Sequence, residues 1–266
     1  MTDRQPTVTL TAEQITDFQE QGYLAIDRIT SDAEVAHLRE VYDRIFAERA
    51  GREEGNQFDL AGTDEDGKEA HLPQILNPAK YAPELLETEL LANAQAIAQQ
   101  LLGPDARAGF AHAIFKPARH GAPTPWHQDA AYWNPNFIHR SISVWVPLQE
   151  ATLENGCMHF VPRSHEMEIV RHQSINNDPR VHGLELHPDE MHHADNAVAC
   201  PLPPGGATFH GGYMLHYTPP NRSDIPRRAL ILSLAAAGQP RKTSISFPWM
   251  DEKQTARDQR AKAAQQ

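Results

Sequence analysis

Three side chains of this sequence have the types and the spacing of a metal site. His127 and Asp129 flank Gln128, and His216 follows much later in the sequence. Two histidines and one carboxylate can occupy one face of an Fe(II) octahedron, which leaves positions for a co-substrate and O2. Arg227, eleven residues after His216, could hold the far carboxylate of a 2-oxo acid. The pattern therefore predicts non-haem iron chemistry with 2-oxoglutarate as co-substrate.

Spacing alone does not select this triplet, because a chain with fifteen histidines is expected to contain such patterns by chance. Two further triplets occur, at His187-Pro-Asp189 and His193-Ala-Asp195. They lie in or next to residues 182–193, a polar stretch that contains proline and lacks strand alternation. Ligands on loops are held less firmly than ligands on strands, so we favour His127 and Asp129. We interpret residues 182–193 as a solvated loop, with adventitious Zn or Ni binding as the alternative.

The third ligand could be His210 or His216, since both flank a glycine-rich turn. Three blocks bear on this choice: Thr124-Pro-Trp-His-Gln-Asp-Ala-Ala-Tyr-Trp133, Leu153-Glu-Asn-Gly-Cys-Met-His-Phe-Val-Pro-Arg-Ser-His165, and His216-Tyr-Thr-Pro-Pro-Asn-Arg-Ser-Asp-Ile-Pro-Arg227-Arg-Ala-Leu. In this order they closely resemble the phytanoyl-CoA dioxygenase family, and the resemblance extends from about residue 10 to residue 236. In that family the distal ligand begins the last block. The resemblance therefore implies Fe(II) held by His127, Asp129 and His216, with His210 behind the metal.

The resemblance also implies a binding site for 2-oxoglutarate. Arg227 matches the arginine that binds the C5 carboxylate, through two parallel charge-assisted hydrogen bonds. Arg228 is its rival, but alternation along a strand would turn Arg228 to the opposite face. Thr218 matches a hydroxyl that supports the same carboxylate and Trp145 an aromatic lining residue, although plain packing could explain either. Further contacts to the co-substrate are expected from three residues: Gln128, Gln74 and His112.

The implied reaction is hydroxylation of a small or medium-sized metabolite by O2, with release of succinate and CO2. Related halogenases have Gly or Ala in place of the metal-binding carboxylate, so Asp129 predicts that no halogen is incorporated. Two alternatives stay open: a cupin-type metal enzyme that does not use 2-oxoglutarate, and a binding barrel without activity. Arg227 argues against the first alternative, and the intact ligand set argues against the second.

The substrate is not encoded in any motif. The family name suggests an acyl-CoA, yet we find no cluster of Lys and Arg that a CoA diphosphate would need. Several residues beside the first triplet could form the pocket wall, with residues 172–193 as a lid: Trp126, Tyr132, Trp133, Asn134 and Phe137.

Composition excludes several classes of partner. Lys and Arg number 24 against 35 for Asp and Glu, a net charge of -11, so nucleic acid and anionic membranes are not expected as partners. The first residues are polar, and no apolar run reaches the length of a membrane span, so a cytoplasmic location is expected. Cys157 and Cys200 are expected to be reduced, buried thiols, with a disulfide as the alternative. The oligomeric state stays open.

Helical patterns precede strand patterns along the chain, which predicts an α+β fold. We expect a single domain: a helical part over about residues 10–103, a double-stranded β-helix or jelly-roll core over about 106–250, and a charged tail over 251–266. Helix starts are expected at the capping residues Thr11 and Ser31, and a third helix over 83–102. Residues 51–69 should form a loop. The tail should be helical or disordered and take no part in the chemistry.

Overall fold

The helices of the computed structural model, which describes residues 4–65 and 67–265, begin where the sequence places their capping residues. The α-helices are α1 (Ala12–Gln21), α2 (Asp32–Ala47), α3 (Glu89–Leu102), α4 (Pro248–Asp251) and α5 (Ala256–Ala263). Thr11 caps α1 in a complete capping box with Gln14. Ser31 caps α2, but the Glu34 carboxylate turns away and accepts hydrogen bonds from the first backbone amides of α3.

The third helix is shorter than the sequence predicted. Pro83–Glu87 forms a separate 3-10 turn, and α3 begins only after Thr88. Thr88 adopts extended backbone angles, and its side chain accepts a hydrogen bond from the Leu91 amide. The capping hydroxyl therefore sets the start of the helix, rather than the proline.

Thirteen strands occur among the described residues, and eleven of them form the two sheets of the core, while β8 and β9 pair with each other. The bounds are β1 (Tyr23–Ile26), β2 (Gln57–Asp59), β3 (Pro73–Leu76), β4 (Arg107–Lys116), β5 (Thr124–His127), β6 (Phe137–Pro147), β7 (Met158–Phe160), β8 (His172–Ser174), β9 (Leu184–Leu186), β10 (Val198–Cys200), β11 (Ala207–Gly211), β12 (His216–Thr218) and β13 (Arg227–Pro240). Seven of them form one sheet in the order β1-β11-β6-β13-β4-β3-β2, and four form a second in the order β10-β7-β12-β5. The predicted jelly-roll core with buttressing helices is confirmed.

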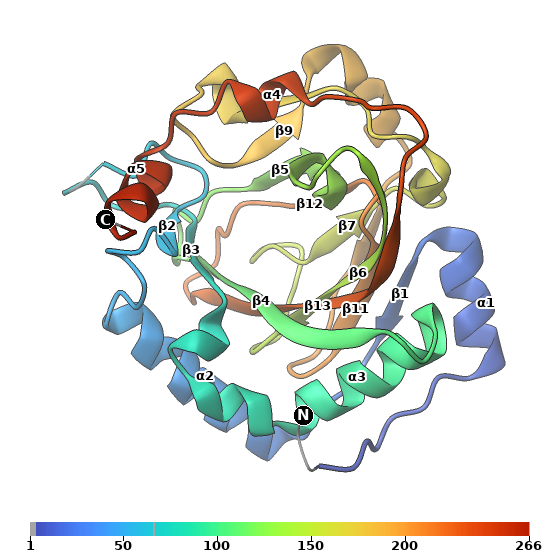
Figure 1. The fold of residues 1–266 in the computed structure, drawn as a ribbon. Coiled ribbons are helices and arrows are strands. Elements are labelled where there is room, and N and C mark those ends of the chain that lie inside the picture. Colours follow the sequence, from blue (N-terminus) through green and yellow to red (C-terminus); the bar gives the residue numbers. More distant parts are fainter. Residues whose placement is uncertain (1–3, 66, 266) are drawn as a thin grey trace.

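The seven-stranded sheet has two different faces. Helices α2 and α3 lie along its outer face, as Figure 1 shows. Apolar residues from both helices and from β6, β11 and β13 form the main hydrophobic cluster there. Along β6, Ile142 and Val144 point into this cluster, whereas Ser143 and Trp145 point to the inner face. The inner face meets the four-stranded sheet and lines a cavity.

A bulge in β4 decides which of its residues face inward. Pairing with β13 runs from Lys116 to His112 and resumes at Phe110, so Ala111 is the extra residue. Phe110 packs in the outer cluster, whereas His112 lines the inner cavity. In a regular strand these two residues would share a face, so the bulge turns His112 inward.

One segment differs from the sequence expectations. The predicted loop over residues 51–69 contains the short strand β2, which pairs with β3 at the sheet edge. The tail takes the helical form, one of the two forms expected for it: Arg260 of α5 donates to the carbonyl of Arg52 and forms an ion pair with Asp64. Both cysteines are free and buried, as expected. Among the described residues, no helix combines the length and the apolar character needed to cross a membrane.

Candidate active site

Two histidines face each other at the centre of the cavity. His127 ends β5 and His216 begins β12, and the two residues are directly paired in the four-stranded sheet. Their rings lie 4.1 Å apart. The Nδ1 atom of His127 lies 2.7 Å from the Pro125 carbonyl, and that of His216 lies 2.9 Å from the Met214 carbonyl. Each Nδ1–H therefore donates to its own strand, and each Nε2 lone pair is free for a metal.

Asp129 completes a group that fits an iron ion. Its Oδ1 atom lies 3.6 Å from the Nε2 atoms of both His127 and His216. The ligand atoms of the three residues all lie within 4.8 Å of one another, and no other group of three such ligands occurs among the described residues. Two imidazoles and one carboxylate on one side of a central point form the facial triad of non-haem iron oxygenases.

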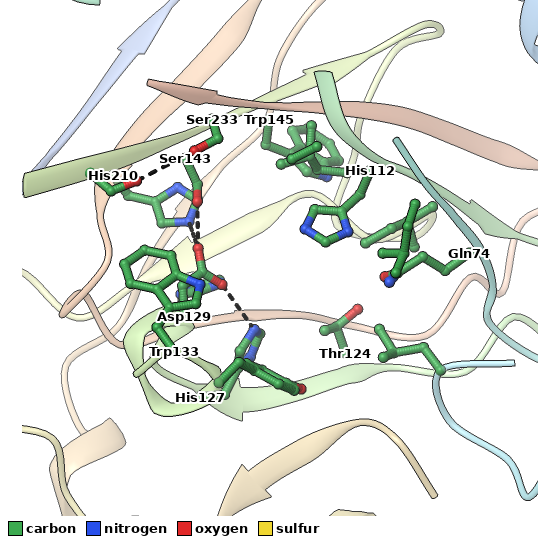
Figure 2. A pocket seen from close by; sticks show the side chains of 18 of the residues that line it. Gln74, His112, Thr124, His127, Asp129, Trp133, Ser143, Trp145, His210 and Ser233 are labelled. Atoms are coloured by element: carbon green, nitrogen blue, oxygen red, sulfur yellow. Dashed lines mark hydrogen bonds and ion pairs between the residues drawn. The ribbon is translucent and has the colours of Figure 1, made fainter. Parts of the chain in front are cut away.

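The second carboxylate oxygen of Asp129, Oδ2, is contacted by Ser143 and His210 (Figure 2). Ser143 of β6 donates its hydroxyl to Oδ2 at 2.5 Å, and Nε2 of His210 lies 3.5 Å from the same oxygen. Burial opposes ionisation of Asp129, yet the surrounding histidines hold its pKa well below the ordinary value. Burial also holds the pKa of His216 far below its ordinary value, so this imidazole is neutral and able to ligate.

Arg227 is a buried cation with unsatisfied hydrogen-bond donors in the described part of the chain. Its side chain lines the cavity and the residue is 1 % exposed. Its Nε and Nη1 atoms are buried, with no hydrogen-bond partner among the described residues. Burial lowers the pKa of Arg227 to about 10, and its guanidinium lies 5.4 Å from the Trp145 ring. The hydroxyl of Thr218, also in the cavity lining, is likewise buried and accepts or donates no hydrogen bond within residues 4–65 and 67–265.

These unpartnered atoms fit a carboxylate. Unpaired buried donors are costly in proteins, and their presence in a cavity indicates a ligand that satisfies them. Lys116 is the nearest rival, but its ammonium already donates to the carbonyls of Ala122, Thr218 and Pro219. The neighbouring Arg228 points to the outer face, where Nε and Nη2 bind the Asp43 carboxylate at 2.6 and 3.0 Å. The predicted separation of the two arginines is confirmed.

The other predicted co-substrate residues have different outcomes. Gln74 of β3 and His112 of β4 line the cavity, on adjacent strands. The prediction for Gln128 is wrong. Its side chain is fully buried outside the cavity lining, and it binds the carbonyls of Glu168 and Tyr213 and the amide of Val170. Because side chains alternate along the strand, Gln128 points away from the face on which His127 lies.

The cavity has a volume of about 630 Å³ and extends well beyond the metal ligands. Tyr132 and Trp133 line it as expected, whereas Trp126, Asn134 and Phe137 are not among its described lining residues. The tail, which was expected to take no part in the chemistry, reaches this cavity, because Arg257 is among its lining residues.

The loop histidines divide into two groups. His182 lines the cavity, so part of the predicted lid is a wall. His187 and His193 lie outside the metal group and contact Asp189 and Glu190, respectively. The choice of the first His-x-Asp triplet therefore agrees with the geometry.

Sequence reasoning missed Ser143 and Arg257. Strand alternation could have found Ser143, because it shares a face of β6 with Trp145. No local signal marks Arg257, since it reaches the cavity through the docking of α5 against residues far away in the sequence.

Residues 18–229 match the profile of a family described as phytanoyl-CoA dioxygenase. The chain belongs to this family. It is 27 % identical, over 230 residues, to a probable alpha-ketoglutarate-dependent hypophosphite dioxygenase of Stutzerimonas stutzeri, covering 85 % of this chain and 79 % of that protein. It is 28 % identical, over 244 residues, to a methylphosphonate hydroxylase of Gimesia maris, covering 87 % and 83 %.

A solved structure gives the same assignment. The crystal structure of EvdO2 from Micromonospora carbonacea var. aurantiaca complexed with 2-oxoglutarate matches with a TM-score of 0.77 and 36 % identity, covering 93 % of this chain and 100 % of that one. Together with the His–Asp–His group, these relationships identify the chain as an Fe(II)- and 2-oxoglutarate-dependent oxygenase.

Proposed function

We propose that this phytanoyl-CoA dioxygenase family member hydroxylates a small or medium-sized metabolite, with release of succinate and CO2. The observation that carries the proposal is the buried guanidinium of Arg227, whose Nε and Nη1 atoms find no hydrogen-bond partner in the described part of the chain. It lies in the cavity that also holds the His–Asp–His group. A cupin-type enzyme without a 2-oxo acid would have no use for this cation at that position.

Each residue has a defined task in this proposal. His127, Asp129 and His216 hold Fe(II), with both imidazoles oriented by backbone carbonyls and the carboxylate oriented by Ser143. Arg227 and Thr218 bind the C5 carboxylate of 2-oxoglutarate. When bound, iron with 2-oxoglutarate and O2 supplies the oxidant that inserts oxygen into a C–H bond. Three further residues form the wall of the co-substrate end: Trp145, Gln74 and His112.

The size of the cavity supports a small or medium-sized substrate. Its volume of about 630 Å³ must hold both the co-substrate and the metabolite, and ordinary small-molecule sites span roughly 300–1,000 Å³. Two of the relatives above are named for small phosphorus compounds. Tyr132 and Trp133 supply apolar walls that exclude water beside the metal group.

Two broader expectations are proposals of the same kind. We propose that the chain works as one domain, because helical and strand residues share the main hydrophobic cluster. A cytoplasmic location is proposed because both cysteines are free thiols, which such a compartment keeps reduced.

The test is co-substrate turnover by the purified protein. Apo-protein reconstituted with Fe(II) should convert 2-oxoglutarate to succinate in an O2-dependent reaction, slowly without substrate and faster with it. A His216→Gln variant, which loses a ligand, serves as the inactive control. A wild-type protein that binds Fe(II) tightly but neither binds nor turns over 2-oxoglutarate would exclude the proposal and favour the cupin-type alternative.

A further inference from the structure

The lining of the cavity is more positive than iron and co-substrate require. Asp129 is the only acidic side chain among its described lining residues, whereas three arginines contribute: Arg140, Arg227 and Arg257. On the proposed function, the charges of Fe(II) and Arg227 are offset by Asp129 and by the two carboxylates of 2-oxoglutarate. The other two arginines have no counterpart in this balance, although the whole protein carries a net charge of -11.

Arg140 finds its partners outside the cavity. Its half-exposed side chain donates to the carbonyl of Leu102 and lies 3.9 Å from the Asp105 carboxylate. The guanidinium of Arg257, in contrast, retains an unsatisfied hydrogen-bond donor in the described part of the chain. Its Nη1 atom binds the Asp258 carboxylate at 3.0 Å, but its Nε atom is buried and has no hydrogen-bond partner among the described residues.

The Arg257 side chain is held in place by its surroundings. Its guanidinium lies 5.2 Å from the ring of Phe58, and α5 is anchored by the contacts of Arg260 described above. A Cβ atom on Gly55 would lie 2.5 Å from the Arg257 carbonyl, so the backbone of α5 packs tightly against this turn. The Arg257 side chain is therefore a fixed part of the cavity wall.

His182 lies against the same phenyl ring. Its imidazole contacts Phe58 edge-on at 4.9 Å and stacks on Tyr132 at 6.0 Å. Its Nδ1 atom is buried and has no hydrogen-bond partner among the residues that the structure describes. Burial, reinforced by the nearby charges of Lys253 and Arg257, lowers the pKa of His182 to about 3, so the ring is neutral and can donate one hydrogen bond. The Arg257 cation and the neutral His182 donor thus contact the same ring, that of Phe58.

We propose that Arg257 and His182 form a subsite for an acidic group of the substrate, either a carboxylate or a phosphorus oxyanion. Both groups accept hydrogen bonds and carry a negative charge, which complements a lining that has three arginines and, among its described residues, Asp129 as the only acidic side chain. The inference rests on the proposed function, because it assigns Arg227 and the metal group to iron and 2-oxoglutarate. It adds that the metabolite is an anion, bound through residues of the loop before β9 and of the C-terminal helix α5.

Small acids and their neutral analogues can probe this subsite. Methylphosphonate and acetate, each paired with its neutral counterpart (dimethyl methylphosphonate and acetamide), are titrated into the anaerobic Fe(II)–2-oxoglutarate enzyme and followed by calorimetry. At least one acid should bind about tenfold or more tightly than its neutral counterpart, because a hydrogen bond between charged groups is worth about 1.5–3 kcal/mol. The acid that shows the larger preference identifies the group of the substrate.

Variants then locate the binding. Arg257→Gln should weaken the preferred acid by about tenfold or more, while Arg257→Lys should retain part of the binding. Lys262→Gln removes one positive charge from an exposed position of the same helix and should change nothing. The affinity for 2-oxoglutarate should be unaltered in all three variants.

The possible failures are distinguishable. Equal binding of acids and neutral analogues, or an Arg257→Gln variant that binds acids like the wild type, overturns the subsite. Displacement of 2-oxoglutarate by the acids, or loss of 2-oxoglutarate binding in Arg257→Gln, also overturns it and places Arg257 in the co-substrate site. If the wild type binds no 2-oxoglutarate at all, the proposed function itself fails.

Discussion

Replacing Arg227 by methionine should separate ligand binding from folding. Methionine keeps most of the side-chain length and its packing against Trp145 but removes the charge. Losing one partner of a buried charge pair typically costs about 3–5 kcal/mol, which corresponds to roughly a hundred- to several-thousand-fold weaker binding of 2-oxoglutarate. Fe(II) binding should persist, since Arg227 is not among the three grouped ligands.

The same change should stabilise the ligand-free protein. Burial lowers the pKa of Arg227 from an ordinary value of about 12.5 to about 10, and at about 1.4 kcal/mol per pH unit the buried charge costs about 3 kcal/mol. Arginine is charged in both the folded and the unfolded chain at pH 7, so the folded state bears this cost. The lost cation–π contact offsets roughly 0.5–2 kcal/mol. A net gain of about 1–3 kcal/mol in the free energy of unfolding is therefore expected.

Two measurements check this prediction. Anaerobic titration of 2-oxoglutarate into the Fe(II) forms gives the loss of affinity, and urea unfolding of the apo-proteins gives the change in stability. Arg228→Met is the matched control, because it removes a surface pair with Asp43 that is worth at most about 1 kcal/mol and should leave 2-oxoglutarate binding intact. Affinity within threefold of the wild type, or a clearly destabilised apo-protein, would refute the reasoning.

Four further outcomes are expected. His216→Ala should abolish Fe(II) binding while His187→Ala leaves it intact, as measured by iron content after desalting; the reverse result would mean that the wrong triplet was chosen. Ser143→Ala should weaken Fe(II) binding about 10- to 100-fold, because the Asp129 carboxylate loses the donor that orients it; unchanged affinity in a calorimetric titration counts against that role. With a substrate in hand, mass spectrometry of products formed in chloride buffer should show oxygen and no chlorine. Burial lowers the pKa of His172 from about 6.5 to about 4. The stability that this neutral ring contributes is therefore present above pH 6.5, and the free energy of unfolding falls by about 3 kcal/mol as the pH drops to 4. In urea unfolding, His172→Gln should reduce this dependence of stability on pH, and an unchanged dependence would exclude the assignment.

The metal group could be predicted from the sequence because its geometry is local. His127 and Asp129 are separated by one residue, and the extended backbone of Gln128 places both side chains on one face. His216 required the family resemblance, since spacing left His210 open. The separation of Arg227 from Arg228 likewise followed from alternation alone.

Other parts of the site depend on structural features that a repeating sequence pattern does not reveal. His112 faces the cavity because of the bulge at Ala111, which a sequence pattern does not reveal. Gln128 lies between two ligands in the sequence, yet its side-chain amide forms hydrogen bonds with backbone groups more than 40 residues away. Arg257 depends on how α5 docks against the turn around Gly55.

The docking of α5 has a consequence for what the family match can say about this enzyme. The match to the family profile ends at residue 229, whereas part of the cavity wall, including Met250 and Arg257, comes from later in the chain. The match therefore covers the metal ligands and Arg227 but carries no information on this part of the wall. A truncation that removes α5 would alter that wall, so a substrate should be ruled out only with protein in which α5 is intact.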